Sequence, residues 1–165
     1  MNNDPLPAGL ADAFINLGYN GGDCTLLFVY MALALVISSI CSLLEATLLS
    51  TPMSYINTLE QQGVKGAARL KKLKMEVDES ISAILVVNTI ANTVGASLVG
   101  AQAAELFQST GVGVISGLFT FLILMFSEII PKTIGSYYWR KLAIPASSVI
   151  KGMIFITYPP NICIF

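Results

Sequence analysis

Oxygen-bearing side chains stand at helical spacing inside two long apolar segments of this sequence. Ser38, Ser42 and Glu45 are spaced i, i+4 and i+7, and Asn88 and Asn92 are spaced i, i+4. Such spacing places each set on one face of a helix. Counted from the segment ends nearest the basic residues, Ser42 and Asn88 lie at depths of about 12 and 13 Å. We therefore expect the two sets to lie at one level.

Ser127 and Glu128 form a third polar group, and Pro131 follows closely in the same apolar run. A proline cannot donate a backbone hydrogen bond and obstructs the helical ladder, so nearby carbonyl oxygens lose their partners. Non-helical backbone is tolerated at membrane depth only where it lines protein or a water-filled cavity. We therefore expect a break at Pro131 that brings Glu128 to the level of the other two groups.

Together these residues supply hydroxyl, amide and carboxylate oxygens, which are the ligands of hard cations. The chain has no His, and its 3 Cys residues are far apart in the sequence, so zinc, copper and iron sites are disfavoured. An all-oxygen set instead favours Mg²⁺ or Ca²⁺. Mostly neutral ligands imply modest affinity, which suits transport because a captured ion must also be released.

Structural roles are the alternative for the same residues. Ser and Asn in membrane helices often form hydrogen bonds between helices. Glu45 either contributes to a site or pairs with a basic residue, since it lies five residues from the end of its segment. Gly95 and Gly100 are expected to allow close helix packing. For Glu128 a purely structural role is least expected, because a carboxylate inside a membrane is costly.

The segments that carry these residues predict an all-α membrane protein. The 165 residues are 55% hydrophobic and 12% charged, whereas soluble domains have about 25% charged residues. Three apolar segments, at about 24–50, 80–107 and 112–130, approach or exceed the roughly 20 residues that a membrane-spanning helix needs. We expect three transmembrane helices per protomer, the third broken at Pro131.

The basic residues predict the orientation in the membrane. All 9 Lys and Arg residues fall between the first two segments or after the third. By the positive-inside rule, the N-terminus is outside and the C-terminus is cytoplasmic in a multi-pass protein of the cell membrane. Residues 53–78 predict an amphipathic juxtamembrane helix interrupted at Gly63, with a solvated linker as the alternative. Residues 132–165, interrupted by Pro and Lys, predict interfacial or re-entrant helices. A fourth span over 142–165, which would put the C-terminus outside, is the alternative.

Three stretches match the order and spacing of one known family. They are SSICSLLEATLLS at 38–50, LEQQGVKGAARLKKL followed by ISAILVVNTIAN within 59–92, and FSEIIPKTIG at 126–135. In this order they resemble the Ser-rich first span, the juxtamembrane helix with the Asn-bearing second span, and the Glu-hydrophobic-hydrophobic-Pro-Lys segment of the transmembrane domain of the CorC/CNNM magnesium transporters. The resemblance covers most of the chain.

The resemblance implies a homodimer with three transmembrane helices per protomer and a belt of juxtamembrane helices in the lipid bilayer. It also implies that Mg²⁺ binds between the helices and is exported, with Na⁺ as the coupling ion. Family members continue into cytoplasmic CBS domains, absent here, so we expect a module of a longer protein. Carried over by position, the metal ligands are Ser38, Ser42, Asn88, Asn92 and Glu128.

The sequence departs from the family pattern beside these ligands. Ser127 and Val87 stand where the family usually or often has Gly, and Leu44 stands where it often has Ser. Backbone contacts to an ion near Ser127 and Val87 are therefore not carried over.

The sequence gives little support for an enzyme or a nucleic-acid-binding protein. Without His there is no Ser–His pair, no Asp lies within a predicted span, and Lys132 has no partner motif for a Ser–Lys pair, so we expect no enzyme. A net charge of −1 gives no footprint for nucleic acid. Two alternatives stay open. A non-transporting anchor for cytoplasmic domains would tolerate apolar replacement of the ligands, and a divalent-cation channel would need no Na⁺ gradient.

Overall fold

The computed structural model describes residues 24–157, with the side chains of 107–112 left out. Within these residues the chain forms helices and no strands. Three helical segments are long and apolar enough to cross a bilayer, namely Cys24–Ser50, Val77–Leu106 and Gly113–Tyr137. The 25 residues of the shortest span about 38 Å, more than the roughly 30 Å of hydrocarbon. The prediction of an all-α membrane protein with three spans is confirmed.

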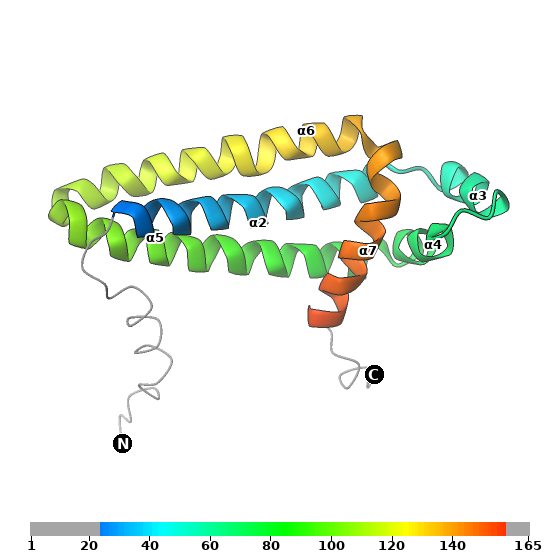
Figure 1. Cartoon of the computed structure of the whole chain (residues 1–165), viewed down its shortest axis with the longest axis horizontal. Coiled ribbons are helices and arrows are strands. Elements are labelled where there is room, and N and C mark those ends of the chain that lie inside the picture. Colours follow the sequence, from blue (N-terminus) through cyan, green and yellow to red (C-terminus); the bar gives the residue numbers. More distant parts are fainter. Residues whose placement is uncertain (1–23, 158–165) are drawn as a thin grey trace, which may run out of the picture.

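The three spans lie side by side as a flat bundle (Figure 1). Helix α2 (Cys24–Ser50) packs against both α5 (Val77–Leu122) and α6 (Ile130–Tyr137). Helix α5 folds back on itself, so that its first part and its last part belong to different spans (Figure 1). Large apolar side chains on the outside of the bundle, such as Phe28, Leu33 and Phe121, are more than half exposed. A surface of this kind suits lipid, where each helix satisfies its own backbone groups.

The third span does not break at Pro131, and this prediction is corrected. Residues Ile123–Ile129 form a π-helix, η1, and α6 continues directly from it through Pro131 to Tyr137. In a π-helix each N–H bonds the carbonyl five residues back, so the turn before the proline is wider than an α-turn. Pro131 then falls in the first turn of α6, where a missing N–H is tolerated. The irregular segment lies before the proline and contains Ser127 and Glu128.

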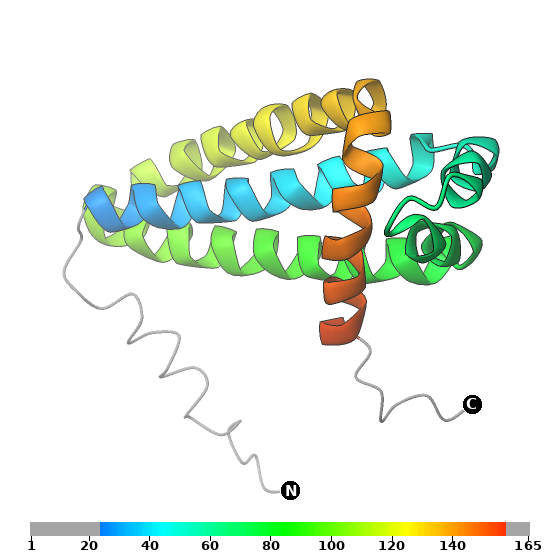
Figure 2. The ribbon, with the colours of Figure 1, turned by 45° about the vertical axis from the view of Figure 1, so that its right-hand side comes forward.

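Two short helices replace the single juxtamembrane helix predicted for 53–78. They are α3 (Met53–Gln61) and α4 (Ala67–Met75), which pack beside each other beyond the end of α2 (Figure 2). The predicted interruption at Gly63 is confirmed, and Gly66 adds a second. Their φ angles of 68° and 97° lie in the left-handed region that residues with a side chain avoid.

Helix α7 (Trp139–Thr157) crosses the bundle steeply at the end where α3 and α4 lie (Figure 1). It runs through Pro145 without ending, and it is not among the candidate spans found in the described residues. Its buried face, which includes Ala143, Ala146 and Ile150, packs on a core that holds Leu48 of α2 and Leu70 of α4. Of the residues 132–165 predicted as interfacial or re-entrant helices, 132–137 instead form the end of the third span and Trp139–Thr157 form α7, and 158–165 lie outside the described residues.

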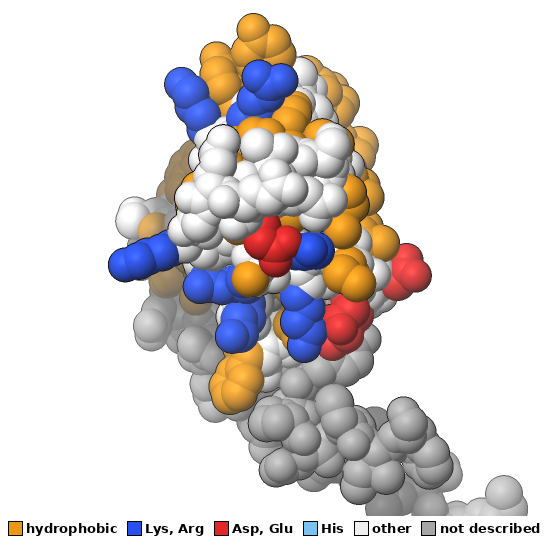
Figure 3. All heavy atoms as spheres, turned by 90° about the vertical axis from the view of Figure 1, so that its right-hand side faces the viewer, with side chains coloured by type: hydrophobic (Ala, Val, Ile, Leu, Met, Phe, Trp, Pro, Cys, Tyr) orange, Lys and Arg blue, Asp and Glu red, His pale blue; other side chains and the backbone are white. Residues whose placement is uncertain are grey.

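All 9 basic residues of the chain lie on the elements at this end, which we call the basic end (Figure 3). Lys74 is one of those that join two helices. The ammonium of Lys74 on α4 donates to the backbone oxygens of Leu48 and Leu49, at 2.8 and 3.0 Å. These carbonyls belong to the last turn of α2, where a helix has no partners of its own. Burial lowers the pKa of the Lys74 ammonium from its usual value.

Candidate functional site

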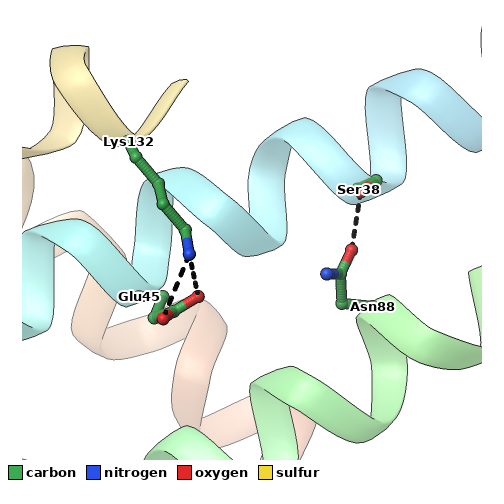
Figure 4. Close-up of polar contacts among 4 residues, drawn as sticks. All are labelled: Ser38, Glu45, Asn88 and Lys132. Atoms are coloured by element: carbon green, nitrogen blue, oxygen red, sulfur yellow. Dashed lines mark hydrogen bonds and ion pairs between the residues drawn. The ribbon is translucent and has the colours of Figure 1, made fainter. Parts of the chain in front are cut away.

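The first two spans meet through a polar contact between Ser38 and Asn88. The Ser38 hydroxyl, fully buried, donates a hydrogen bond to Oδ1 of Asn88 at 2.6 Å (Figure 4). Gly95 packs on Ala34 in the same interface, so residue numbers rise along α2 while they fall along α5. The two helices are therefore antiparallel, and the Ser38–Asn88 contact is a hydrogen bond between helices, the structural role that the sequence left open for these residues.

Ser42 and Asn92 lie on opposite sides of this contact, and the prediction of one common level is corrected. Each is four residues from its neighbour in the Ser38–Asn88 pair, which is about 6 Å along a helix. Because the helices are antiparallel, Ser42 lies toward the basic end and Asn92 toward the opposite end. The two residues are thus separated by about 12 Å along the bundle. The sequence estimate failed because it placed the ends of the two apolar segments in one plane.

The third span places Glu128 between the levels of Ser38 and Ser42. The Ser39 hydroxyl lies 3.2 Å from the carbonyl oxygen of Phe126, and the Lys132 ammonium lies 3.3 Å from Glu45. Both contacts join residues whose numbers differ by 87, so the two helices run parallel with a constant register. Glu128 then stands at the level of residue 41. Within residues 24–157 it has neither a hydrogen bond nor an ion pair, and it is partly buried.

Three buried oxygens around these levels have no hydrogen-bond partner among the described residues. They are Oγ of Ser42, Oγ of Ser127 and Oδ1 of Asn92. Ser42 and Ser127 are 1% and 0% exposed, so bulk water does not reach them. Buried polar groups in proteins are nearly always paired, and an exception calls for a bound water or ion as its explanation.

Sequence reasoning missed two hydroxyls of this region. Ser127 was grouped with Glu128 as a polar pair before Pro131 but was left out of the metal ligands, because the family usually has Gly at that position. Thr47 is fully buried, and its hydroxyl also lacks a partner within residues 24–157. A Cβ built on Gly135 of α6 would lie 3.2 Å from Oγ1 of Thr47 and 2.7 Å from the carbonyl oxygen of Leu43. That close approach of α6 to α2 is what encloses Thr47, and the sequence alone does not reveal it.

The donor set suits a hard cation only if neutral oxygens provide most of the contacts. Among the described residues no group of three or more His, Cys, Asp or Glu side chains could hold a metal. Glu128 is the carboxylate at the level of the unpartnered hydroxyls, and hydroxyl or amide oxygens must supply the remaining protein ligands. Oxygens of this kind are used for Mg²⁺ and Ca²⁺ and seldom for softer metals.

Glu45 has a structural partner, which decides between the two roles considered for it. Its carboxylate is 18% exposed and lies 3.3 Å from the ammonium of Lys132, which is 47% exposed (Figure 4). The pair joins α2 to α6 on the basic-end side of Ser42.

The two glycines expected at close helix contacts behave differently. A Cβ on Gly95 would clash with the Cβ of Ala34, so the close packing predicted there is confirmed. Gly100 has no atom within 4 Å of such a Cβ, so the prediction is wrong for that residue.

Comparison with known proteins identifies the family. The pattern of the Cyclin M transmembrane N-terminal domain, CNNM, matches residues 29–164, which is most of the chain. This chain belongs to the CorC/CNNM family of transmembrane domains. The resemblance of its three stretches to that family is thereby confirmed.

Bacterial relatives extend well beyond the matched region. The chain is 36% identical over 122 residues to the UPF0053 protein sll1254 of Synechocystis, and 33% identical over 133 residues to a UPF0053 protein of Haemophilus influenzae. These matches cover 74% and 81% of the chain but only 35% and 32% of the relatives. A third, 32% identical over 101 residues (61% of the chain and 24% of the relative), is the UPF0053 inner membrane protein YfjD of Escherichia coli. The chain thus spans about a third of these relatives or less.

Proposed function

We propose that this domain transports Mg²⁺ across the membrane, as an Na⁺-coupled exporter that works by alternating access. The observation that supports this most is the set of unpartnered buried oxygens on Ser42, Ser127 and Asn92. Leaving such groups unsatisfied costs about 1–3 kcal/mol each, and all three spans contribute to the region that contains them. Because Ser42 and Asn92 lie about 12 Å apart along the bundle, a cation that passes from level to level would partner these oxygens in turn, whereas a simple membrane anchor gives no reason to retain them.

The stagger of the residues suggests an order of contacts along the bundle. Glu128, with the hydroxyls of Ser42 and Ser127, forms the level nearest the basic end and supplies the negative charge. Ser38 and Asn88 form the next level, and Asn92 lies one turn farther on. Mg²⁺ prefers about six oxygens and gives up its waters reluctantly, so retained waters complete the shell at each level. At each level the ion therefore needs only a few protein ligands, and water supplies the rest.

The π-helix is the element that we propose to move. It carries Ser127 and Glu128, and a return to α-helical bonding over this segment would rotate both side chains about the helix axis. Such π-segments occur frequently at functional sites. Movement of η1 and α6 against α2 would then expose the bound ion to the opposite side, as alternating access requires.

The orientation in the membrane and the partners of the domain are also part of the proposal. The basic end faces the cytoplasm, by the positive-inside rule, which leaves the N-terminus outside and the C-terminus inside. The domain works as a homodimer with CBS-type domains on its cytoplasmic side, as the family resemblance implies. No enzymatic activity is proposed for it.

Ion flux into liposomes tests this function. The chain is reconstituted with an Mg²⁺-sensitive dye inside, and flux is recorded with and without an Na⁺ gradient, for the wild type, Glu128→Gln and Ser127→Ala. Ser97→Ala is the control, because its exposed hydroxyl bonds only the carbonyl of Thr93 on its own helix. We expect Na⁺-dependent flux that Glu128→Gln abolishes and Ser97→Ala retains. Flux that does not depend on Na⁺ would indicate a channel. No flux in the wild type or in any variant would contradict transport and favour a membrane anchor.

A further inference from the structure

A second polar cavity lies at the basic end, outside the proposed transport site. Its volume is about 120 Å³, and it is lined by residues of α4, of the start of α5 and of α7. The lining combines three cations with two carboxylates over two apolar side chains. The cations are Arg69, Lys72 and Lys151, the carboxylates are Glu76 and Glu79, and the apolar residues are Leu73 and Ile154.

The charges of this cavity are not matched to one another. Lys72 lies 3.9 Å from Glu76, and Arg69 donates to the hydroxyl of Ser148 rather than to a carboxylate. Lys151 and Glu79 line the same cavity, yet within residues 24–157 neither forms an ion pair, with the other or with any residue. One free positive and one free negative charge therefore border a common space, which is the complement of a zwitterion.

The elements around the cavity lie where a bilayer surface must be. Val77, the first residue of the second candidate span, follows directly on Glu76. On α7, Phe155 and Ile156 are 67% and 77% exposed, while Lys151 on the same helix is also exposed. A helix that exposes large apolar side chains next to basic ones lies at the interface of a membrane. The cavity is therefore bordered by lipid.

We propose that this cavity binds the headgroup of an aminophospholipid, with the phosphate at Lys151 and Arg69 and the primary ammonium at Glu79. The apolar Leu73 and Ile154 then contact the glycerol end of the lipid. A drug-sized ligand needs about 300–1,000 Å³, so the cavity is too small for a nucleotide and fits a headgroup. A primary ammonium donates hydrogen bonds to a carboxylate, whereas a choline group has no N–H to donate.

Thermal unfolding of the full chain in detergent tests this proposal. The micelles contain a small fraction of phosphatidylethanolamine, phosphatidylcholine or phosphatidylglycerol with identical acyl chains, and the fluorescence of Trp139 reports unfolding. We expect the ethanolamine lipid to raise the melting temperature more than the other two. Lys151→Gln and Glu79→Gln should each raise the concentration of this lipid needed for half the effect by about tenfold, because each removes a charged hydrogen-bond partner.

Lys141→Gln is the matched control, since it removes the same charge from the same helix outside the cavity. It should leave the response to the ethanolamine lipid unchanged. An equal response to all three lipids, a larger response to phosphatidylglycerol, or an equal loss in Lys141→Gln would overturn the proposal. So would full stabilisation by inorganic phosphate alone. All the substituted side chains are exposed, so the variants should fold, and none of these outcomes bears on Mg²⁺ transport.

Discussion

Two alanine substitutions on one face of α2 should differ in their effect on the stability of the Mg²⁺-free protein, with only Ser38→Ala lowering it. Ser38 donates to Asn88, so Ser38→Ala removes a hydrogen bond between helices and leaves the amide oxygen without a donor. Ser42 is equally buried but has no partner among the described residues, so Ser42→Ala removes a polar group that is unsatisfied there. The two side chains differ by one helical turn and by little else.

The magnitudes follow from what hydrogen bonds contribute inside membranes. Such bonds between helices average about 0.6 kcal/mol and reach about 1.7 kcal/mol. Ser38→Ala should therefore lower the free energy of unfolding by about 0.6–1.7 kcal/mol. Ser42→Ala should leave it unchanged or raise it by up to about 1 kcal/mol, because the unsatisfied hydroxyl costs about that much or more.

In the presence of Mg²⁺, Ser42→Ala should become destabilising relative to the wild type. A ligand at 100 times its Kd stabilises a protein by about 2.7 kcal/mol, and each tenfold loss of affinity removes about 1.4 kcal/mol of binding free energy. If the Ser42 hydroxyl contacts the ion and its loss weakens binding tenfold, Ser42→Ala should lose about 1.4 kcal/mol of the Mg²⁺-dependent stabilisation.

Unfolding in increasing concentrations of SDS measures both effects. The single Trp of the chain, Trp139, serves as the fluorescent reporter. The reasoning is refuted if Ser42→Ala destabilises the Mg²⁺-free protein as much as Ser38→Ala and leaves the response to Mg²⁺ intact. Ser42 would then be an ordinary partner in helix packing.

Three further substitutions test other contacts by the same unfolding assay. Gly135→Ala should lower the free energy of unfolding by about 1–3 kcal/mol, because its Cβ would approach the carbonyl of Leu43. Gly100→Ala should not lower it, since no described atom lies within 4 Å of a Cβ at that position. Equal effects of the two substitutions would contradict the packing of α6 on α2. Glu45→Gln breaks the ion pair with the half-exposed Lys132 and should cost under about 1 kcal/mol, with a larger loss indicating a role beyond this pair. Lys74→Gln should destabilise at neutral pH by removing two hydrogen bonds from the end of α2. Because burial lowers the folded-state pKa of Lys74 below its usual 10.5, the unfolded state binds more protons between the two pKa values. This term therefore stabilises the wild type relative to the variant as pH rises toward 10.5, and a difference that does not grow over that range would contradict it.

Local pattern predicted the spans, because hydropathy and helix length depend only on neighbouring residues. A hydrogen bond from one of these Ser or Asn residues to a neighbouring helix was foreseeable for a similar reason, but its partners were not, since the depth estimate placed Asn88 level with Ser42 and the structure pairs it with Ser38. The relative height of Ser42 and Asn92 was not, because it depends on how far α5 and α2 extend past each other at the basic end. That stagger is fixed by the packing of α4 and α7, which no single segment encodes.

The form of the third span also depends on tertiary packing. Pro131 correctly indicated an irregular backbone, but whether a proline ends a helix, kinks it or is accommodated by a π-helix depends on what packs beside it. Here Gly135 lets α6 lie close against α2, which favours a continuous helix after the proline. The partnerless hydroxyl of Ser127 follows from that arrangement and was therefore hidden from the sequence.

An experimental structure of the domain in the presence of Mg²⁺, or of Mn²⁺ as its more visible substitute, tests the central proposal most directly. The account predicts one octahedral ion with oxygens at about 2.0–2.1 Å, held by the Glu128 carboxylate together with the Ser42 or Ser127 hydroxyl. An ion bound elsewhere, or these three side chains unchanged and without metal at saturating concentration, would contradict it.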